Sequence, residues 1–414
     1  MNAPAASPRR RRPRVLVAGP IYGGSLETAR STARACEAIG ADARLLDFDP
    51  FGAGWHTIER MSASADHRAK IQAGYAQVLG DMVVASAAEW RPDLVIALAQ
   101  APLNASVCAK LRGAGIKVAF WFVENFRVLT YWKHVAKDYD AFFAIQDGPF
   151  LDMLRQAGSP KAVYLPTACD PDRHRPVVLT PVERQRFGSD VSFAGAPYLN
   201  RRRMLMGLID LHPRIWGEGW VGTELERFVA ERGARFNLEE MIRIFAATKI
   251  NLNIHSANHV DGLDPDPDYV NPRTFELAAC EGFQLVDARL PLPAMFADDE
   301  MITFGSIPEL RALIAHYLKR PDERSAIAKR ARARVVAEHS FAHRVRRIFE
   351  EMLPAELQPA AGAATPHRAT QARTPAQGPG SLADAISTLE RTASKMSSDE
   401  ALLRLLKHVQ DVKL

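Results

Sequence analysis

Short apolar runs alternate with segments of helical periodicity through most of the chain. Apolar runs bounded by turn residues are typical of buried strands, and apolar residues at every third or fourth position are typical of helices. In the first half the pattern predicts strands at 15–19, 44–48, 94–98, 118–122, 140–145 and 162–165. It predicts helices at 25–39, 75–90 and 104–113. Strands joined by helices run parallel, so we expect a doubly wound sheet.

A second series of alternating elements follows an expected linker at 166–181. Its predicted strands are 190–195, 214–217, 249–255 and 283–287, with a helix over 271–282 and further helices within 308–353. The fold class we predict is therefore α/β, with two Rossmann-like doubly wound domains facing a cleft. We expect these domains to span 14–175 and 176–354.

The two ends of the chain carry different patterns. Residues 1–13 are arginine-rich and expected to be disordered; they are a solvated terminus, a binding arm for an anionic partner or part of an export signal. Residues 355–380 are rich in alanine, proline and glycine, which predicts a flexible linker. Helical periodicity returns in the tail 381–414, which we expect to dock either on the body of the chain or on a protein partner.

Composition limits the classes of function. The chain has 414 residues, 47% of them hydrophobic, which is enough for two or three folded domains. The formal net charge of +5 is carried by Arg9, Arg10, Arg11, Arg12 and Arg14. Because the rest of the chain is not basic, we expect no nucleic-acid partner. No apolar run approaches the roughly 18 to 20 residues of a transmembrane helix, and the cysteines form no close pair, so we expect a cytoplasmic location.

The most informative segment is the helix predicted after Asn271. Asn271 can cap this helix, Pro272 fits its first position and Gly282 can close its far end. Arg273 and Glu276 then fall in the opening turn. Because α/β sheets bind nucleotides where a strand's carboxyl end leads into a helix, we expect a nucleotide at this helix start.

Several landmarks, in their order and spacing, resemble the CgeB-like glycosyltransferases, bacterial proteins related to the spore-maturation protein CgeB. They are YDAFF (139–143), YLPTACDP (164–171), DVSFAG (190–195) followed by Arg202 and Arg203, INLNIH (250–255), NPRTFELAACEG (271–282) and EHSFAHR (338–344). The resemblance covers about 15–353. It implies a GT-B fold and transfer of a sugar from a nucleotide diphosphate donor held mainly by the second domain.

A nucleotide sugar presents a ribose diol and a diphosphate, and the 271–282 helix can meet both. The Glu276 carboxylate can accept hydrogen bonds from both ribose hydroxyls, unless it only complements the helix dipole. Arg273, together with the helix start at Asn271 and Thr274, can face the diphosphate, unless it forms only a surface salt bridge.

Other residues of the second half are candidates for the same donor site. Gly195 follows a buried strand and allows the backbone to approach a phosphate closely. Arg202 or Arg203, on the following helix, can neutralise the diphosphate without a metal, and adjacency means that at most one of them does so. His255, at the end of its strand, is a candidate catalytic residue that can donate to phosphate or sugar, with a structural role as the alternative.

In the first half, Gly23 and Gly24 lie in the loop after the first strand. The resemblance implies that this loop faces the donor phosphates and the acceptor, and its spacing is not the G-x-G-x-x-G of dinucleotide sites. Trp121, Glu124 and Asn125 lie around another strand end and can line an acceptor pocket. Glu124 is the best candidate for the general base if the enzyme inverts.

The acidic segment Asp266-Pro267-Asp268 satisfies the D-x-D pattern of metal-binding GT-A transferases. It lies in the second half of the chain, where GT-A enzymes do not place that motif, so we expect no metal and no other cofactor. Asp268 precedes Glu276 by eight positions, similar to the E-x7-E pattern of many retaining GT-B enzymes. Because the first residue here is aspartate, the stereochemistry stays open.

The leading hypothesis is a metal-independent GT-B glycosyltransferase that moves a sugar from a nucleotide sugar to a glycan, protein or small-molecule acceptor. The alternative is a catalytically inactive, transferase-like protein that binds a nucleotide or glycan and acts through its C-terminal tail. A nicotinamide oxidoreductase is disfavoured by the glycine spacing. P-loop, zinc-protease and serine-hydrolase motifs are absent from the sequence.

Overall fold

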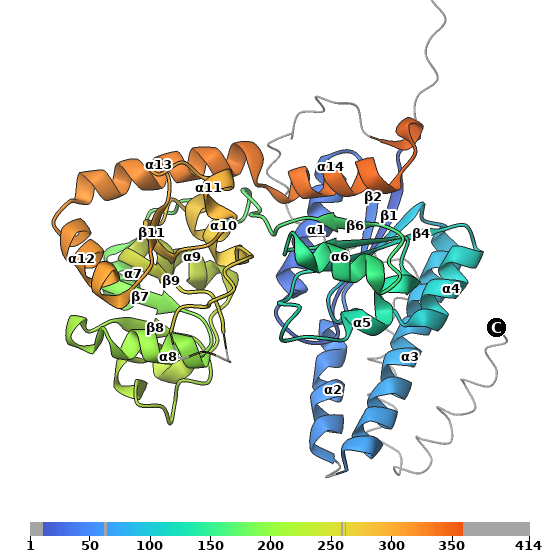
Figure 1. Cartoon of the computed structure of the whole chain (residues 1–414), viewed down its shortest axis with the longest axis horizontal. Coiled ribbons are helices and arrows are strands. Elements are labelled where there is room, and N and C mark those ends of the chain that lie inside the picture. Colours follow the sequence, from blue (N-terminus) through green and yellow to red (C-terminus); the bar gives the residue numbers. More distant parts are fainter. Residues whose placement is uncertain (1–10, 62–63, 258–259, 261, 359–414) are drawn as a thin grey trace, which may run out of the picture. The chain divides into compact units, whose positions relative to one another are not determined.

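The computed structural model describes residues 11–61, 64–257, 260 and 262–358, so Arg9, Arg10, most of the expected linker and the tail 381–414 lie outside the described residues. The described chain forms two parallel sheets covered by helices (Figure 1). The predicted α/β class with two Rossmann-like halves is confirmed. We call the first sheet with its helices the N-lobe and the second the C-lobe.

The N-lobe sheet has six strands in the order β2-β1-β3-β4-β5-β6, all pairing in parallel. The strands are β1 Arg14–Ala18, β2 Asp42–Leu46, β3 Leu94–Leu98, β4 Lys117–Phe122, β5 Ala141–Ala144 and β6 Ala162–Tyr164. Every residue of β3 is buried, which is typical of a parallel sheet covered on both faces.

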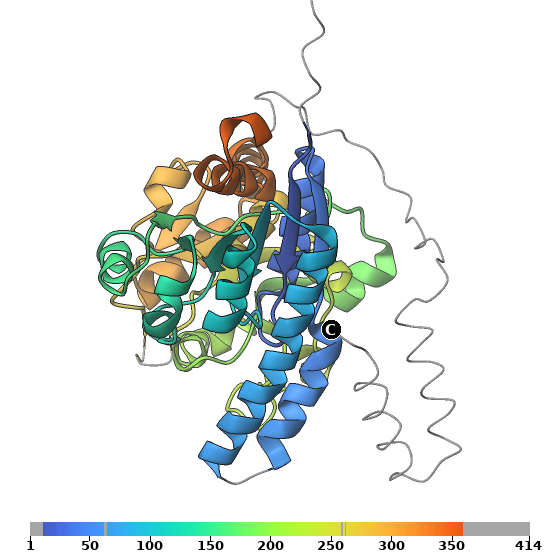
Figure 2. The same cartoon turned by 90° about the vertical axis from the view of Figure 1, so that its right-hand side faces the viewer.

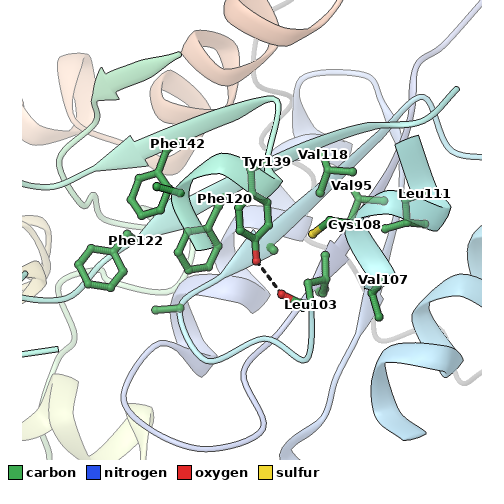
Figure 3. Close-up of a cluster of buried hydrophobic side chains, with 14 of the residues drawn as sticks. Val95, Leu103, Val107, Cys108, Leu111, Val118, Phe120, Phe122, Tyr139 and Phe142 are labelled. Carbon is green, nitrogen blue, oxygen red and sulfur yellow. Dashed lines mark hydrogen bonds between the residues drawn. The ribbon is translucent and has the colours of Figure 1, made fainter. Parts of the chain in front are cut away.

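Side chains alternate between two cores on the faces of this sheet. The helices of the N-lobe are α1 Leu26–Ala38, α2 Asp49–Met61, α3 Ala65–Trp90, α4 Ala105–Gly113, α5 Trp132–Val135 and α6 Pro149–Gln156. From β4, Phe120 and Phe122 point into the core shared with α3 and α4, where the Tyr139 hydroxyl donates to the Leu103 carbonyl oxygen at 2.9 Å (Figure 3). Ala119 and Trp121 enter the opposite core, next to α1.

The helices α2 and α3 form a long pair that extends away from the N-lobe sheet (Figure 2). The predicted helix 75–90 is only the second half of α3, and α2 was not predicted. Within α2 only Gly52 and Ile58 are buried, so the helix offers little apolar periodicity to recognise.

The C-lobe sheet has the order β11-β10-β9-β7-β8, again all parallel. Its strands are β7 Ser189–Ala194, β8 Arg214–Trp216, β9 Thr248–Asn253, β10 Gln284–Asp287 and β11 Ile302–Phe304. Its helices are α7 Pro181–Phe187, α8 Leu199–Met206, α9 Leu238–Ala247, α10 Pro272–Ala279, α11 Leu292–Met295, α12 Ile307–Leu318 and α13 Pro321–Glu338. Short 3-10 turns are η1 Ala136–Asp138, η2 Ile209–Leu211, η3 Glu226–Phe228, η4 Ala230–Gly233 and η5 Ala355–Leu357.

The last helix, α14 Phe341–Met352, returns to the N-lobe. It packs on α1, and Phe341 and Val345 join the core beneath the first sheet. A parallel bridge between Cys169 and Ser340 ties the connection from β6 to the start of α14. By packing, α14 therefore belongs to the N-lobe, although it lies within the expected range 176–354.

Candidate active site

A cavity of about 450 Å³ lies at the carboxyl ends of strands from both sheets. It is lined by the loops after β1 and β4 from the N-lobe and by the ends of β7 and β9 and the start of α10 from the C-lobe. Ligands of open α/β sheets bind at this edge, because the loops there are free to vary while the strands fix their positions.

The start of α10 has the geometry expected from the sequence. The Asn271 side chain caps the helix by accepting from the Thr274 backbone N–H at 3.1 Å, and Pro272 occupies the first turn. Arg273 Nη1 donates to Glu276 Oε2 at 2.8 Å, and both side chains line the cavity while remaining partly exposed. The Thr274 side chain is fully buried and bonded to Asn253 and Asn271, so it does not reach the cavity as a donor-binding group.

His255 is buried completely and does not line the cavity, which contradicts its expected contact with phosphate or sugar. Its Nδ1 lies 2.6 Å from Asp287 Oδ1, and its Nε2 accepts from the Asn271 backbone N–H at 2.8 Å. Because Nε2 accepts a hydrogen bond, the ring proton is on Nδ1, which donates a hydrogen bond to Asp287. Burial lowers the pKa of His255 to about 4, so the ring is neutral and holds the start of α10 in place.

Gly195 follows β7 at the cavity, where a β-carbon would lie 3.1 Å from the Phe193 ring and 3.3 Å from the guanidinium of Arg201. Arg201 lines the cavity as a second cation besides Arg273, although the sequence analysis did not select it. Its Nε donates to the Ile254 carbonyl oxygen at 2.9 Å and its Nη1 to the Ala196 carbonyl oxygen at 3.2 Å. Burial lowers its pKa to about 10, and among the described residues it has no ion pair.

The two arginines selected from the sequence lie elsewhere. Neither Arg202 nor Arg203 lines the cavity. Arg202 forms an ion pair with Glu224, with its Nε 3.3 Å from Glu224 Oε1. The neutralising role expected of one of them therefore fits Arg201, one position earlier on α8.

In the N-lobe, Glu124 and Asn125 line the cavity together with Gly24, whereas Gly23 only adjoins it, with a φ of 99°. The Gln100 side-chain amide donates to Glu124 Oε1 at 3.3 Å, and burial raises the pKa of Glu124. A carboxylate with a raised pKa at the mouth of a cleft is suited to accept a proton. Trp121 is fully buried and donates to the Leu165 carbonyl oxygen, so it is a core residue.

The acidic segment pairs with an arginine of the other lobe. Arg127 Nη1 lies 2.8 Å from Asp268 Oδ2, and Arg127 Nε lies 3.3 Å from Asp266 Oδ2. Within the described ranges no group of three His, Cys, Asp or Glu side chains is arranged to hold a metal ion. The two aspartates are thus engaged in ion pairs across the lobes.

A second cavity residue that the sequence analysis missed is His174, in the connection between the sheets. It is 6% exposed, and its Nδ1 accepts from the Asp170 backbone N–H at 3.0 Å. Apart from its place in the YLPTACDP region, nothing in the sequence distinguishes it from a solvated linker histidine.

Comparison with known proteins agrees with this architecture. A family model described as glycosyl transferase-like matches residues 201–350, which include most of α8 and all of β9 and α10. The spore protein CgeB of Bacillus subtilis (strain 168) is 26% identical over 230 residues, covering 53% of this chain and 69% of CgeB. Anabaena HepE, solved in complex with UDP and glucose, superposes with a TM-score of 0.56 at 13% identity, over 82% of this chain and 99% of HepE. The chain is similar to CgeB in sequence and has the two-sheet fold of the GT-B glycosyltransferases.

Other GT-B neighbours have the same two-sheet architecture. Sucrose-phosphate synthase from Thermosynechococcus elongatus superposes with a TM-score of 0.55 at 13% identity, over 82% of this chain and 98% of the synthase. At this identity the likeness establishes the fold alone. In this CgeB-like chain, none of the described helices is long and apolar enough to cross a membrane.

Proposed function

We propose that this CgeB-like protein transfers a sugar from a nucleoside diphosphate donor to an acceptor hydroxyl or amine, without a metal ion, in the cytoplasm. The observation that carries the proposal is the set of charged side chains that line one cavity. Arg201, which has no ion pair among the described residues, lies there with the Arg273–Glu276 pair on the C-lobe side and Glu124 on the N-lobe side.

The diphosphate is assigned to Arg201 and the Gly195 turn. Two nitrogens of Arg201 are held by backbone carbonyl oxygens, which leaves Nη2 for a ligand and fixes the guanidinium plane. A held cation of this kind stabilises the charge that grows on the diphosphate as the bond from the sugar carbon to the phosphate oxygen breaks. The backbone at Gly195 allows the phosphate to approach without a side chain in its path.

The ribose is assigned to Glu276. One oxygen of this carboxylate accepts from Arg273, and the carboxylate retains further acceptor capacity for the ribose diol. HepE was solved with UDP and glucose, and also with UDP-glucose, so UDP-sugars are the first donors to test. We do not assign the sugar, because selectivity for a sugar depends on contacts of about 1–3 kcal/mol each.

The acceptor proton is assigned to Glu124. As the acceptor oxygen or nitrogen forms its bond to the sugar carbon, its proton passes to the Glu124 carboxylate and the nucleoside diphosphate leaves. Burial raises the pKa of Glu124, which improves the carboxylate as a base. The hydrogen bond from the Gln100 side-chain amide fixes the orientation of the Glu124 carboxylate.

Metal independence is also part of the proposal. Asp266 and Asp268, which match the D-x-D pattern, are occupied by Arg127. The positive charge that a metal would bring to the diphosphate is supplied by Arg201.

The test compares wild type with Glu276→Ala. Calorimetry with UDP and other nucleoside diphosphates is expected to detect binding by wild type and none by the variant. Equal thermal stability is expected, because the Glu276 side chain is partly exposed and, among the residues that the structure describes, bonds to Arg273 alone. Unchanged nucleotide affinity in the variant would remove the ribose assignment. A transfer and hydrolysis assay of wild type on UDP-sugars, with EDTA present, then separates an enzyme from an inactive binder.

A further inference from the structure

His174 is a buried polar residue of the cavity for which the transfer mechanism above has no role. It lies in the connection between β6 and α7, one of the segments that join the two lobes. Although it is 6% exposed, it is one of the residues that line the cavity. A histidine buried to this extent is normally held by hydrogen bonds on both ring nitrogens.

One ring nitrogen is occupied by the backbone. The Asp170 N–H donates to His174 Nδ1 at 3.0 Å, and the Asp170 carbonyl oxygen accepts from the His174 N–H at 2.7 Å. Asp170 is itself held by Arg34, whose Nε lies 2.8 Å from Asp170 Oδ2. Because Nδ1 accepts a hydrogen bond, the proton of the neutral ring is on Nε2. Burial lowers the pKa of His174, which keeps the ring in this neutral form.

The other ring nitrogen has no hydrogen-bond partner in the described part of the chain, and it is not sealed from solvent. His174 Nε2 is therefore an N–H donor available to the cavity. Glu276 and Arg273 are the cavity charges that act on this ring most strongly. His174 therefore shares the cavity with the carboxylate assigned to the ribose diol, within range of its charge.

We propose that His174 Nε2–H donates a hydrogen bond to a ribose hydroxyl oxygen of the donor nucleotide. The same hydroxyl donates its own hydrogen to Glu276, because a hydroxyl is both a donor and an acceptor. His174 and Glu276 then bind the same ribose hydroxyl, and the site favours ribonucleotides over nucleotides that lack this hydroxyl. This inference rests on the proposed function, since it specifies how the same site recognises its donor.

Two substitutions distinguish donation to the ribose by Nε2 from a purely structural role, in which Nδ1 only accepts the hydrogen bond from the Asp170 N–H. In His174→Asn, the side-chain oxygen takes the place of Nδ1 and keeps the bond from the Asp170 N–H, while the cavity donor is lost. In His174→Gln, the amide nitrogen takes the place of Nε2, so a cavity donor is kept while the linker bond is lost. A purely structural histidine would be replaced well by asparagine and poorly by glutamine.

The experiment measures binding by calorimetry. The probe is whichever of UDP, GDP, ADP and CDP binds wild type best, together with its 2′-deoxy and 3′-deoxy analogues. His174→Asn is expected to bind the ribonucleotide about tenfold more weakly at an unchanged melting temperature, because one hydrogen bond is lost. One deoxy analogue is expected to bind wild type and His174→Asn equally. His174→Gln is expected to keep ribonucleotide affinity within about threefold and to melt at a lower temperature. In turnover, His174→Asn raises the donor KM and leaves kcat unchanged.

Other results overturn the inference. If His174→Asn binds the ribonucleotide as tightly as wild type, His174 only supports the linker, and the proposed function stands. An equal loss for the ribonucleotide and both deoxy analogues also overturns the ribose contact. If wild type binds none of the four nucleoside diphosphates, the proposed function fails and the inference fails with it.

Discussion

Replacing Arg201 with methionine removes the only charge that we assign to the diphosphate, at nearly constant side-chain length. The variant also loses the bonds from Arg201 to the Ile254 and Ala196 carbonyl oxygens. Each of these contributes about 0.5–1.5 kcal/mol, so a lower melting temperature is expected. Arg201→Lys keeps the charge and is the second variant of the series.

The effect on binding follows from Nη2 of the guanidinium, which has no hydrogen-bond partner in the described part of the chain. Arg201 Nη2 can donate one or two hydrogen bonds to phosphate oxygens, and a hydrogen bond to a charged group contributes about 1.5–3 kcal/mol. Since Arg201 is half-buried and partly hydrated without a ligand, a net loss of about 2–3 kcal/mol is expected. This corresponds to about 30- to 150-fold weaker binding of a nucleoside diphosphate.

The assay compares UDP with uridine by calorimetry, at a temperature where circular dichroism shows each variant to be folded. Arg201→Met is expected to lose UDP affinity and to keep that for uridine, which has no phosphate. The matched control is Arg202→Met on the same helix, because Arg202 pairs with Glu224 outside the cavity. The diphosphate assignment is refuted if Arg201→Met binds UDP as tightly as wild type, or if Arg202→Met has the larger effect.

Two further predictions concern the base and the response to pH. Glu124→Gln keeps the side-chain volume and removes the proton acceptor, so kcat is expected to fall about 10²- to 10⁴-fold at an unchanged Kd for the donor, and an unchanged kcat would exclude Glu124 as the base. His255 has a pKa of about 4 when folded, below its ordinary value of about 6.5, so the unfolded chain binds the additional proton between these values. This pKa difference contributes about 3 kcal/mol to the free energy of unfolding. The contribution is complete above pH 6.5 and is lost as the pH falls towards 4. The free energy of unfolding of His255→Gln, measured with urea, should therefore depend less steeply on pH in this window.

Most strands could be predicted from the sequence because parallel sheets bury both faces of a strand, whereas the short strand β11 was not predicted. The strand β3 was predicted with its observed bounds, Leu94–Leu98, and β4 within one residue. The helix α2 could not be predicted, since only two of its residues are buried and its stability depends on contact with α3. Apolar residues recur periodically along a helix because one of its faces is buried. A helix that buries few side chains therefore shows no such pattern in its sequence.

The position of Arg201 could have been found from the phase of its helix. Met204 and Leu205 are the buried apolar residues of α8, and positions three and four residues earlier share their face. Arg201 is three residues before Met204 and four before Leu205, so it shares its face with both. Arg202 shares a face with Leu205 alone, and Arg203 shares one with neither and is exposed. His174 could not be found in this way. It lies in a connection outside any helix or strand, where no periodic pattern indicates which side chains point inwards.

His255 was selected as a candidate because it lies at the end of its predicted strand. Ile250, Leu252 and Ile254 enter one core, and the alternate residues Asn251, Asn253 and His255 form a polar face. All three are buried instead of facing the cavity openly, and Asn253 and His255 bond to the start of α10.

Hydrogen bonds from this polar face determine where α10 begins. Asn253 bonds to Thr274 and Asn271, and His255 Nε2 accepts from the Asn271 backbone N–H. A helix shifted along the sheet would leave these buried groups unpaired, at about 1–3 kcal/mol each, whereas apolar contacts alone tolerate such a shift at lower cost. The polar residues of β9 therefore act on the site indirectly, because they fix the register of the helix that presents Arg273 and Glu276.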